Sequence, residues 1–103
     1  MKIWIDDIRP APEGYIWCKS VNEVIDTISL SDEYFDLPIT LIDMDHDAGD
    51  YASDGGDYIK FLDYCEECWG KDLPFDIRIH SMNPVGRQNM LAICEKNNWK
   101  VVN

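Results

Sequence analysis

The chain has 103 residues, a hydrophobic share of 46% and a formal net charge of −11, from 20 acidic and 9 basic residues. A length near the lower end of the single-domain range predicts one domain over residues 1–103, and the hydrophobic share excludes a chain too polar to bury a core. The negative charge disfavours bulk nucleic-acid binding, whereas it favours a divalent cation that would let a phosphate approach.

The first half of the chain predicts three strands and one helix. Residues 2–5 are apolar and precede two acids, a pattern typical of a buried parallel strand. Two prolines and a glycine in residues 9–14 exclude a regular helix there. Residues 15–18 predict a second strand, and Ser20 is expected to cap a helix with an apolar face through Ile28. The hydrophobic stretch 38–44 predicts a central strand.

The second half predicts two helices and two further strands. Residues 45–56 are expected to form a loop, and the helix that follows should end at Gly70. Residues 76–80 predict a fourth strand, and a third helix should begin near Pro84. Residues 99–102 predict a terminal strand.

Strands that alternate with helices favour a parallel sheet with right-handed crossovers. We therefore expect an α/β, flavodoxin-like fold of three layers. Its five-stranded parallel sheet would have the order 2-1-3-4-5, with the first helix reduced to a loop and the last helix absent.

Cysteine usage and hydropathy indicate the compartment. Four cysteines without a signal-peptide pattern suggest a reducing cytoplasm. The longest apolar run, at residues 39–42, is far below the roughly 20 residues that a membrane-spanning helix needs. We expect a soluble cytoplasmic protein that does not contact membranes.

Acids follow two neighbouring strands of the predicted sheet. Asp6 and Asp7 come after the first strand, and Asp45 and Asp47 after the third. Ligands of such sheets bind at this carboxyl edge, and Mg²⁺ or Mn²⁺ prefers oxygen ligands. The sequence predicts a cation site made by these four acids, with Asp43 as a lesser candidate. The alternative is that they are solvated loop residues.

Two histidines lie at the same predicted edge. His46 and His80 would act as general base and general acid on a phosphodiester, and Asp45 is included in this candidate catalytic set. A structural histidine is the competing interpretation for each of them.

A phosphate seat is predicted where the third helix begins. Backbone N–H groups there, near Asn83 and Gly86, would bind phosphate together with the side chains of Ser81 and Arg87. Simple helix capping by Asn83 or Ser81 is the alternative. Arg9 would clamp a phosphate or pair with an aspartate.

Cys65 and Cys68 form a CxxC pattern inside a predicted helix. The pattern has no second ligand pair for zinc and no strand-to-helix setting for redox chemistry. Packing thiols are the favoured interpretation.

The chain resembles the cyclic-phosphate processing receiver family in three motifs that span nearly its whole length. They are Asp6-Asp7-Ile8-Arg9-Pro10, Asp45-His46-Asp47-Ala48-Gly49 and His80-Ser81-Met82-Asn83-Pro84-Val85-Gly86. The resemblance implies a response-regulator receiver fold whose pocket handles cyclic phosphates of nucleotides or RNA ends. The chain departs from the family at Asp43, where a small polar residue is usual, and at Ala48, where leucine is usual.

Three functional hypotheses remain for a chain with this resemblance. A metal-assisted phosphoesterase is the leading hypothesis. A receiver phosphorylated on Asp45 is similar in its acids and in Ser81, but such receivers place a lysine after the fifth strand, and here Lys100 precedes the strand end. The third hypothesis is a noncatalytic module that binds a phosphorylated ligand or a protein partner.

Overall fold

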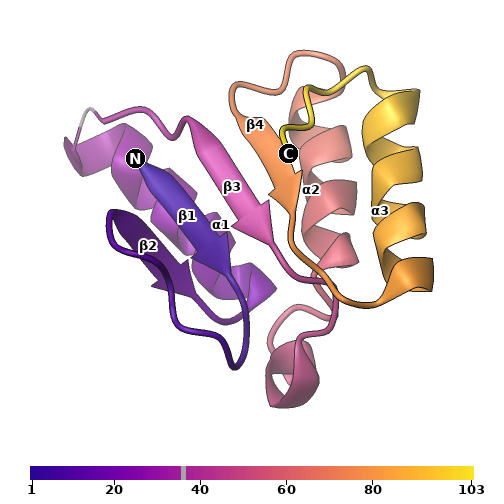
Figure 1. Ribbon diagram of the computed structural model, residues 1–103. Helices are drawn as coiled ribbons and strands as arrows, with labels where there is room; N and C mark the ends of the chain where they lie inside the picture. Colours follow the sequence, from indigo (N-terminus) through magenta and orange to yellow (C-terminus); the bar gives the residue numbers. More distant parts are fainter. Residues whose placement is uncertain (36) are drawn as a thin grey trace.

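The computed structural model describes residues 1–35 and 37–103. Within them, four parallel strands form a sheet of order β2-β1-β3-β4 (Figure 1). The strands are β1 (Lys2–Ile5), β2 (Tyr15–Cys18), β3 (Leu41–Met44) and β4 (Asp76–Ile79). The helices are α1 (Val21–Leu30), α2 (Ile59–Trp69) and α3 (Pro84–Lys96), with a π-helical turn η1 (Ser31–Phe35) and a 3₁₀ turn η2 (Gly49–Ser53). This receiver-like α/β fold, with no helix between β1 and β2, confirms the expected class.

The predicted fifth strand is wrong. Residues 99–102 meet β4 only at an isolated parallel bridge between Ile77 and Val101. Trp99 explains why the pairing is so short, because its indole is buried and its Nε1 donates to the Gly70 carbonyl 2.6 Å away. This contact ties the segment to the end of α2. The strand expected over residues 38–44 is also shorter and begins at Leu41.

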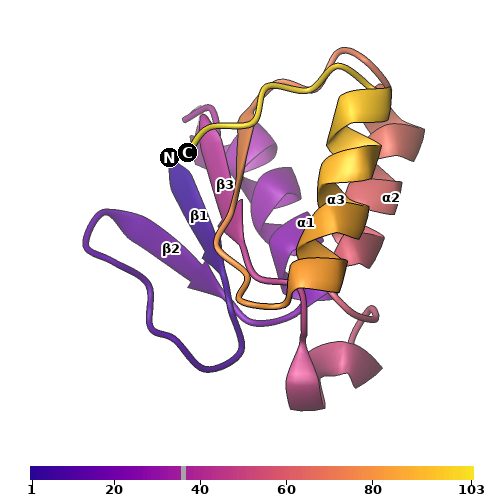
Figure 2. The same ribbon diagram turned by 45° about the vertical axis from the view of Figure 1, so that its right-hand side comes forward.

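All three α-helices lie on one face of the sheet (Figure 2). Right-handed crossovers from β2 to β3 and from β3 to β4 run in the same direction along the sheet, so their helices cover the same face. The connection from β1 to β2 runs in the opposite direction, and it is the loop without a helix. The described chain therefore has two layers instead of the three that we expected.

Side chains alternate between the two faces of the strands. Ile3, Ile5, Ile42 and Ile77 point to the helices and belong to the buried core. The strand register aligns the neighbouring positions on the other face in one row, which consists of Trp17, Trp4, Asp43 and Arg78. The face without helices therefore carries aromatic and charged groups that lead toward the carboxyl edge.

Side-chain caps fix where two helices begin. Ser20 Oγ accepts the N–H of Glu23 at 3.0 Å, as the sequence predicts for α1. At α3 the cap is Asn83, whose Oδ1 accepts the N–H of Gly86 at 3.1 Å. Ser81 acts one step earlier, since its Oγ accepts the Asn83 N–H at 3.1 Å.

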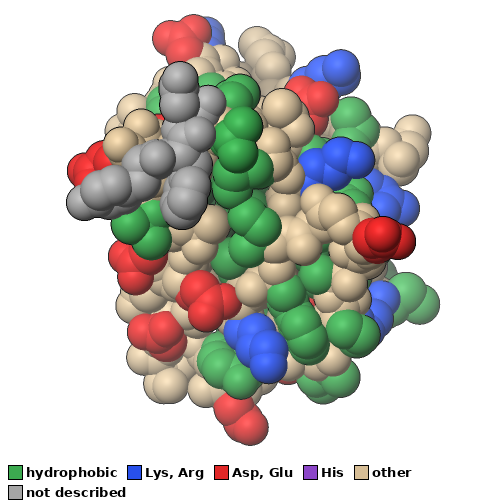
Figure 3. All heavy atoms as spheres, turned by 90° about the vertical axis from the view of Figure 1, so that its left-hand side faces the viewer, with side chains coloured by type: hydrophobic (Ala, Val, Ile, Leu, Met, Phe, Trp, Pro, Cys, Tyr) green, Lys and Arg blue, Asp and Glu red, His purple; other side chains and the backbone are tan. Residues whose placement is uncertain are grey.

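Within the described residues, no helix has the length and apolar character needed to cross a membrane. Acidic, basic and apolar side chains intermingle on the face shown in Figure 3, and no histidine is coloured there.

Candidate functional site

Three acids gather at the carboxyl edge of the sheet. One carboxylate oxygen each from Asp6, Asp7 and Asp45 lies within 4.8 Å of the others. Asp6 and Asp7 follow β1, and Asp45 follows β3, its neighbour in the sheet. Three carboxylates this close repel one another unless a cation lies between them. We call these residues the acidic triad.

Asp6 is buried and accepts hydrogen bonds on both oxygens. Its Oδ1 accepts the backbone N–H groups of Ile8 at 2.9 Å and Arg9 at 2.8 Å. Its Oδ2 lies 2.9 Å from His80 Nε2 and 3.2 Å from Arg9 Nε. Burial alone would raise the pKa of Asp6, but the two N–H groups and His80 lower it. Asp6 is thus an ionised residue whose lone pairs already have partners.

Asp7 experiences the opposite balance. Burial raises the pKa of Asp7, and the negative charges of Asp6, Asp45 and Asp47 raise it further. The backbone of Gly49 closes one side, because a Cβ on Gly49 would collide with Asp7 Oδ2. Asp7 is the member of the acidic triad that gains most from a nearby cation.

Asp47 pairs with His46 instead of joining the acidic triad. Its Oδ1 lies 2.8 Å from His46 Nδ1, and its side chain is 61% exposed. The ring of His46 rests against Gly86 of α3, where a Cβ would overlap its atoms. Asn83 Nδ2 also reaches Asp47 Oδ2, at 3.5 Å. Asp47 and the start of α3 thereby fix the orientation of His46.

His80 is enclosed on every polar edge. Its Nδ1 lies 2.7 Å from Asp43 Oδ1 and its Nε2 lies 2.9 Å from Asp6 Oδ2. Trp4 stacks on the ring with centroids 3.8 Å apart and planes 6° apart. Asp43 is fully buried, and Arg78 Nη1 donates to its other oxygen at 2.8 Å. The structure pairs His80 with carboxylates, and Asp43 is engaged away from the acidic triad.

Arg9 bridges two members of the acidic triad, Asp6 and Asp45. Besides its contact with Asp6, its Nη2 lies 3.8 Å from Asp45 Oδ2 and 3.4 Å from the His80 carbonyl. The side chain is 45% exposed. Its pairing with aspartates is therefore observed, and its open side still faces solvent.

A family model described as a cyclic-phosphate processing receiver domain matches residues 1–96. The chain belongs to this family. No curated protein and no solved structure matches it. Family membership agrees with the receiver-like fold and with the motifs that meet at the carboxyl edge.

The start of α3 in this receiver domain offers fewer free donors than expected. Asn83 takes the Gly86 N–H, and Pro84 has none to give. Arg87 Nη1 donates to the Ile79 carbonyl at the end of β4. Ser81 accepts a backbone N–H, although its hydroxyl proton stays available. The polar groups of residues 81–87 therefore mainly stabilise the turn before α3, and this turn holds His46 in place.

Lys100 does not replace the lysine of phospho-accepting receivers. Its Nζ lies 3.6 Å from Asp76 Oδ2, at the first residue of β4. Parallel strands place this end of the sheet opposite the edge that carries Asp45. Lys100 therefore cannot contact a phosphoryl group on Asp45.

Sequence reasoning missed Trp4, Arg78 and Gly49 as parts of the receiver site. Strand alternation could have found the first two, because Trp4 shares a face with Asp6, and Arg78 shares one with His80. The contact of Gly49 with Asp7 crosses between loops and leaves no periodic signal.

The cysteines lie outside the site. Cys65 is buried and Cys68 exposed, and both are free thiols. Burial raises the pKa of the Cys65 thiol, which keeps it unreactive. Cys65 therefore has the expected packing role in the core, whereas the exposure of Cys68 does not agree with that role.

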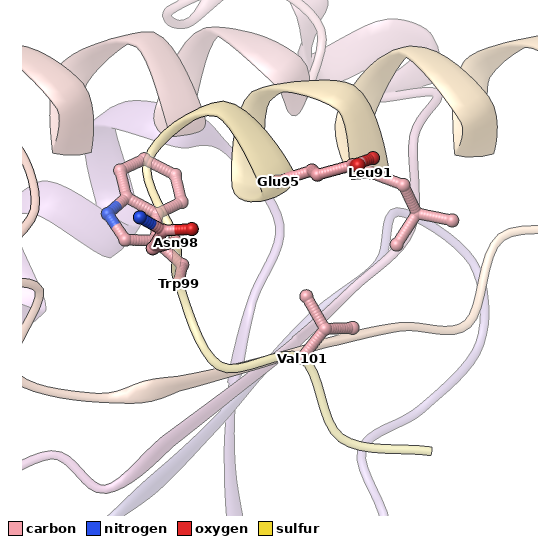
Figure 4. A pocket seen from close by; sticks show the side chains of 5 residues that line it. All are labelled: Leu91, Glu95, Asn98, Trp99 and Val101. Atoms are coloured by element: carbon pink, nitrogen blue, oxygen red, sulfur yellow. The ribbon is translucent and has the colours of Figure 1, made fainter.

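A surface hollow beside α3 is also separate from the acidic triad. Figure 4 shows its lining residues, which are Leu91, Glu95, Asn98, Trp99 and Val101. They come from the later part of α3 and the segment that follows it, whereas the triad lies near the helix start. The hollow therefore contributes nothing to the acidic triad.

Proposed function

We propose that this receiver domain is a metal-assisted phosphoesterase that hydrolyses cyclic phosphates of small nucleotides or RNA ends. The observation that carries the proposal is the acidic triad of Asp6, Asp7 and Asp45, together with His46, which directly follows Asp45 and is oriented by Asp47. Carboxylates that hold a divalent cation beside a proton acceptor are the minimal equipment for hydrolysing a phosphodiester.

The acidic triad fits Mg²⁺ or Mn²⁺ by the chemistry of its donors. Such ions take oxygen ligands, and Mg²⁺ usually binds one or two carboxylates directly. Asp7 and Asp45 suit direct contact, because the four donors around Asp6 already use its oxygens. Asp6 then orients the turn from outside the coordination shell. When bound, the cation would neutralise phosphate charge and lower the pKa of a coordinated water.

His46 is the group placed to accept a proton. Its Nδ1 donates to Asp47, which leaves Nε2 with a lone pair. A water molecule that gives one proton to Nε2 attacks phosphorus, and the bond from phosphorus to one ring oxygen breaks. Solvent protonates that oxygen, and His46 returns its proton to solvent, so the net reaction adds one water across the bond. We assign no proton transfer to His80, since both of its nitrogens face carboxylates.

Phosphate recognition falls to Arg9 and Ser81 at the same edge. The half-exposed guanidinium of Arg9 supplies charge-assisted donors, and the Ser81 hydroxyl adds a neutral one. Because the net charge of −11 repels polyanions, we expect the site to bind the one cyclic phosphate group, on a nucleotide or at an RNA end, and not the rest of a long nucleic acid.

The test is a turnover assay. Pure protein with Mg²⁺ or Mn²⁺ is incubated with 2',3'-cyclic nucleotides and with RNA ends that carry a cyclic phosphate, and products are followed by ³¹P NMR. We expect ring opening that falls by at least about 100-fold in His46→Ala. Lys100→Gln, which changes an exposed cation at the opposite end of the sheet, serves as the control. Absence of turnover on every substrate, in protein that binds Mn²⁺, would exclude the proposal.

A noncatalytic phosphate-binding module is the second candidate. The enclosed His80 favours it, because only one of the two histidines is placed for proton transfer. This module would bind a cyclic nucleotide equally well after His46→Ala, with no turnover in either protein. Equilibrium dialysis with the same nucleotides distinguishes the two functions.

A further inference from the structure

The pair of buried Asp43 and half-exposed Arg78 forms an anchor that the proposed reaction does not use. Asp43 has an exposed fraction of 0%, and each of its oxygens has one partner, His80 on one side and Arg78 on the other. A buried carboxylate is costly unless such partners compensate it, so the loss of either partner would leave Asp43 poorly compensated. Asp43 is therefore held in a single geometry.

The anchor fixes the ring of His80. Trp4 holds the plane of the ring by stacking. The contact of Asp43 with Nδ1 fixes the direction in which the ring points within that plane. Asp43 Oδ1 and Asp6 Oδ2 thus lie within hydrogen-bond distance of the two ring nitrogens. Nε2 then faces Asp6 Oδ2, 2.9 Å away.

Asp6 connects the fixed ring of His80 to the turn that forms the pocket wall. With Oδ2 held by His80, its Oδ1 accepts the N–H groups of Ile8 and Arg9, which shapes the turn after β1. That turn carries Asp7 and the guanidinium of Arg9, the groups that face the proposed cation and phosphate. The chain of contacts runs from Asp43 at the middle of the sheet to the pocket wall.

We propose that Asp43 is a positioning residue of this site, which acts through His80 to hold Asp6 and the turn after β1 in their binding geometry. The inference rests on the proposed function, since the acidic triad is the site that it positions. In this inference His80 has a supporting role, and neither Asp43 nor His80 is a ligand of the cation.

A double-mutant cycle on Mn²⁺ affinity tests the inference. Isothermal titration calorimetry would compare the natural protein with Asp43→Ala, His80→Ala and the variant that carries both changes. Loss of a residue that orients a metal ligand typically weakens metal binding about 10–100-fold. We expect about tenfold weaker Mn²⁺ binding in Asp43→Ala, and no further loss when this change is added to His80→Ala.

Two variants separate positioning from stability. Asp43→Asn keeps the volume of the side chain and provides a folded protein if Asp43→Ala does not fold. Arg78→Gln removes the other partner of Asp43 and leaves the contact with His80 in place. We expect Arg78→Gln to lower the thermal midpoint while it changes Mn²⁺ affinity less than Asp43→Asn does. Equal losses in the two variants, or additive losses in the cycle, would overturn the inference.

A measurement without metal keeps the inference testable whether or not the protein turns over substrate. In ¹H–¹⁵N NMR spectra of the natural protein we expect two slowly exchanging ring N–H signals from His80, because its side chain is only 7% exposed. Asp43→Asn should broaden or shift the Nε2–H signal as well as the Nδ1–H signal. An Nε2–H signal that stays unchanged would contradict the role of Asp43, whereas a failed turnover assay would contradict only the proposed reaction.

Discussion

Arg9 contacts two members of the acidic triad from its guanidinium, with Nε 3.2 Å from Asp6 Oδ2 and Nη2 3.8 Å from Asp45 Oδ2. A positive side chain in this place partly neutralises the negative charge around the proposed cation site, including that of the proposed ligand Asp45. Arg9 and the proposed cation therefore compete electrostatically, although Arg9 also offers donors to a phosphate.

Arg9→Gln is expected to tighten Mn²⁺ binding and to weaken phosphate binding. A half-exposed ion pair contributes about 0.5–1 kcal/mol, which corresponds to roughly two- to fivefold in Mn²⁺ affinity. Calorimetry with Mn²⁺ alone, and then with inorganic phosphate in saturating Mn²⁺, measures both effects. Lys100→Gln removes an equally positive charge far from the triad and should change neither. Weaker Mn²⁺ binding in Arg9→Gln would contradict the competition.

The sequence predicted that acids gather at the carboxyl edge of the sheet, because two simple physical rules determine this arrangement. Asp6 and Asp45 directly follow apolar runs, and parallel strands bring such ends together. The partners of individual side chains were not predictable in the same way. His80 meets Asp43 and Asp6 across three strands, so this contact depends on strand order and register, which no local pattern encodes. The fifth strand failed because β-propensity cannot foresee that Trp99 ties its segment to α2.

Asp7→Asn should stabilise the protein at neutral pH. The pKa of Asp7 is raised in the folded state, so ionising Asp7 costs stability as the pH rises through that pKa. The variant removes this cost. Its advantage should be absent below about pH 4, where an ordinary aspartate is protonated in the unfolded chain too, and should grow to roughly 0.5 kcal/mol at neutrality.

Thermal melts of both proteins at acid and neutral pH, without divalent ions, measure this effect. A gain of this size corresponds to a midpoint about 2–4 °C higher for a domain of this length. Asp63→Asn, an exposed acid on α2, should change the midpoint little at either pH. A lower midpoint for Asp7→Asn at neutral pH would show that burial and charge repulsion together do not make the ionised form of Asp7 costly.

Gly49→Ala should remove the stabilisation that a divalent cation provides. Gly49 has a φ of +56°, and a Cβ there would collide with Asp7 Oδ2. Natural protein at 100 times the dissociation constant of Mn²⁺ should gain about 2.7 kcal/mol relative to protein in chelator. The variant should gain much less, because Asp7 must move.

Gly14→Ala is the matched control for this change. Gly14 also has a positive φ, +87°, but a Cβ there would meet nothing within 4 Å. Both variants carry backbone strain of about 1–2 kcal/mol in the absence of metal. Only Gly49→Ala should lose the response to Mn²⁺ in thermal melts. Equal responses in the two variants would mean that Asp7 does not bind the cation.

Gly86→Ala should impair turnover while it leaves the fold intact. The ring of His46 occupies the space that a Cβ on Gly86 would need, so the substitution pushes the ring out of its place between α3 and Asp47. Alanine is favoured over glycine inside a helix by about 1 kcal/mol, which offsets part of the crowding. We expect at least about a tenfold lower kcat on cyclic nucleotides and a thermal midpoint within a few degrees of the natural protein. A lower kcat with an unchanged thermal midpoint identifies His46 as the group affected, because general loosening of α3 would lower kcat and the midpoint together. Unchanged kcat in a folded Gly86→Ala protein would show that the reaction does not need the observed orientation of His46.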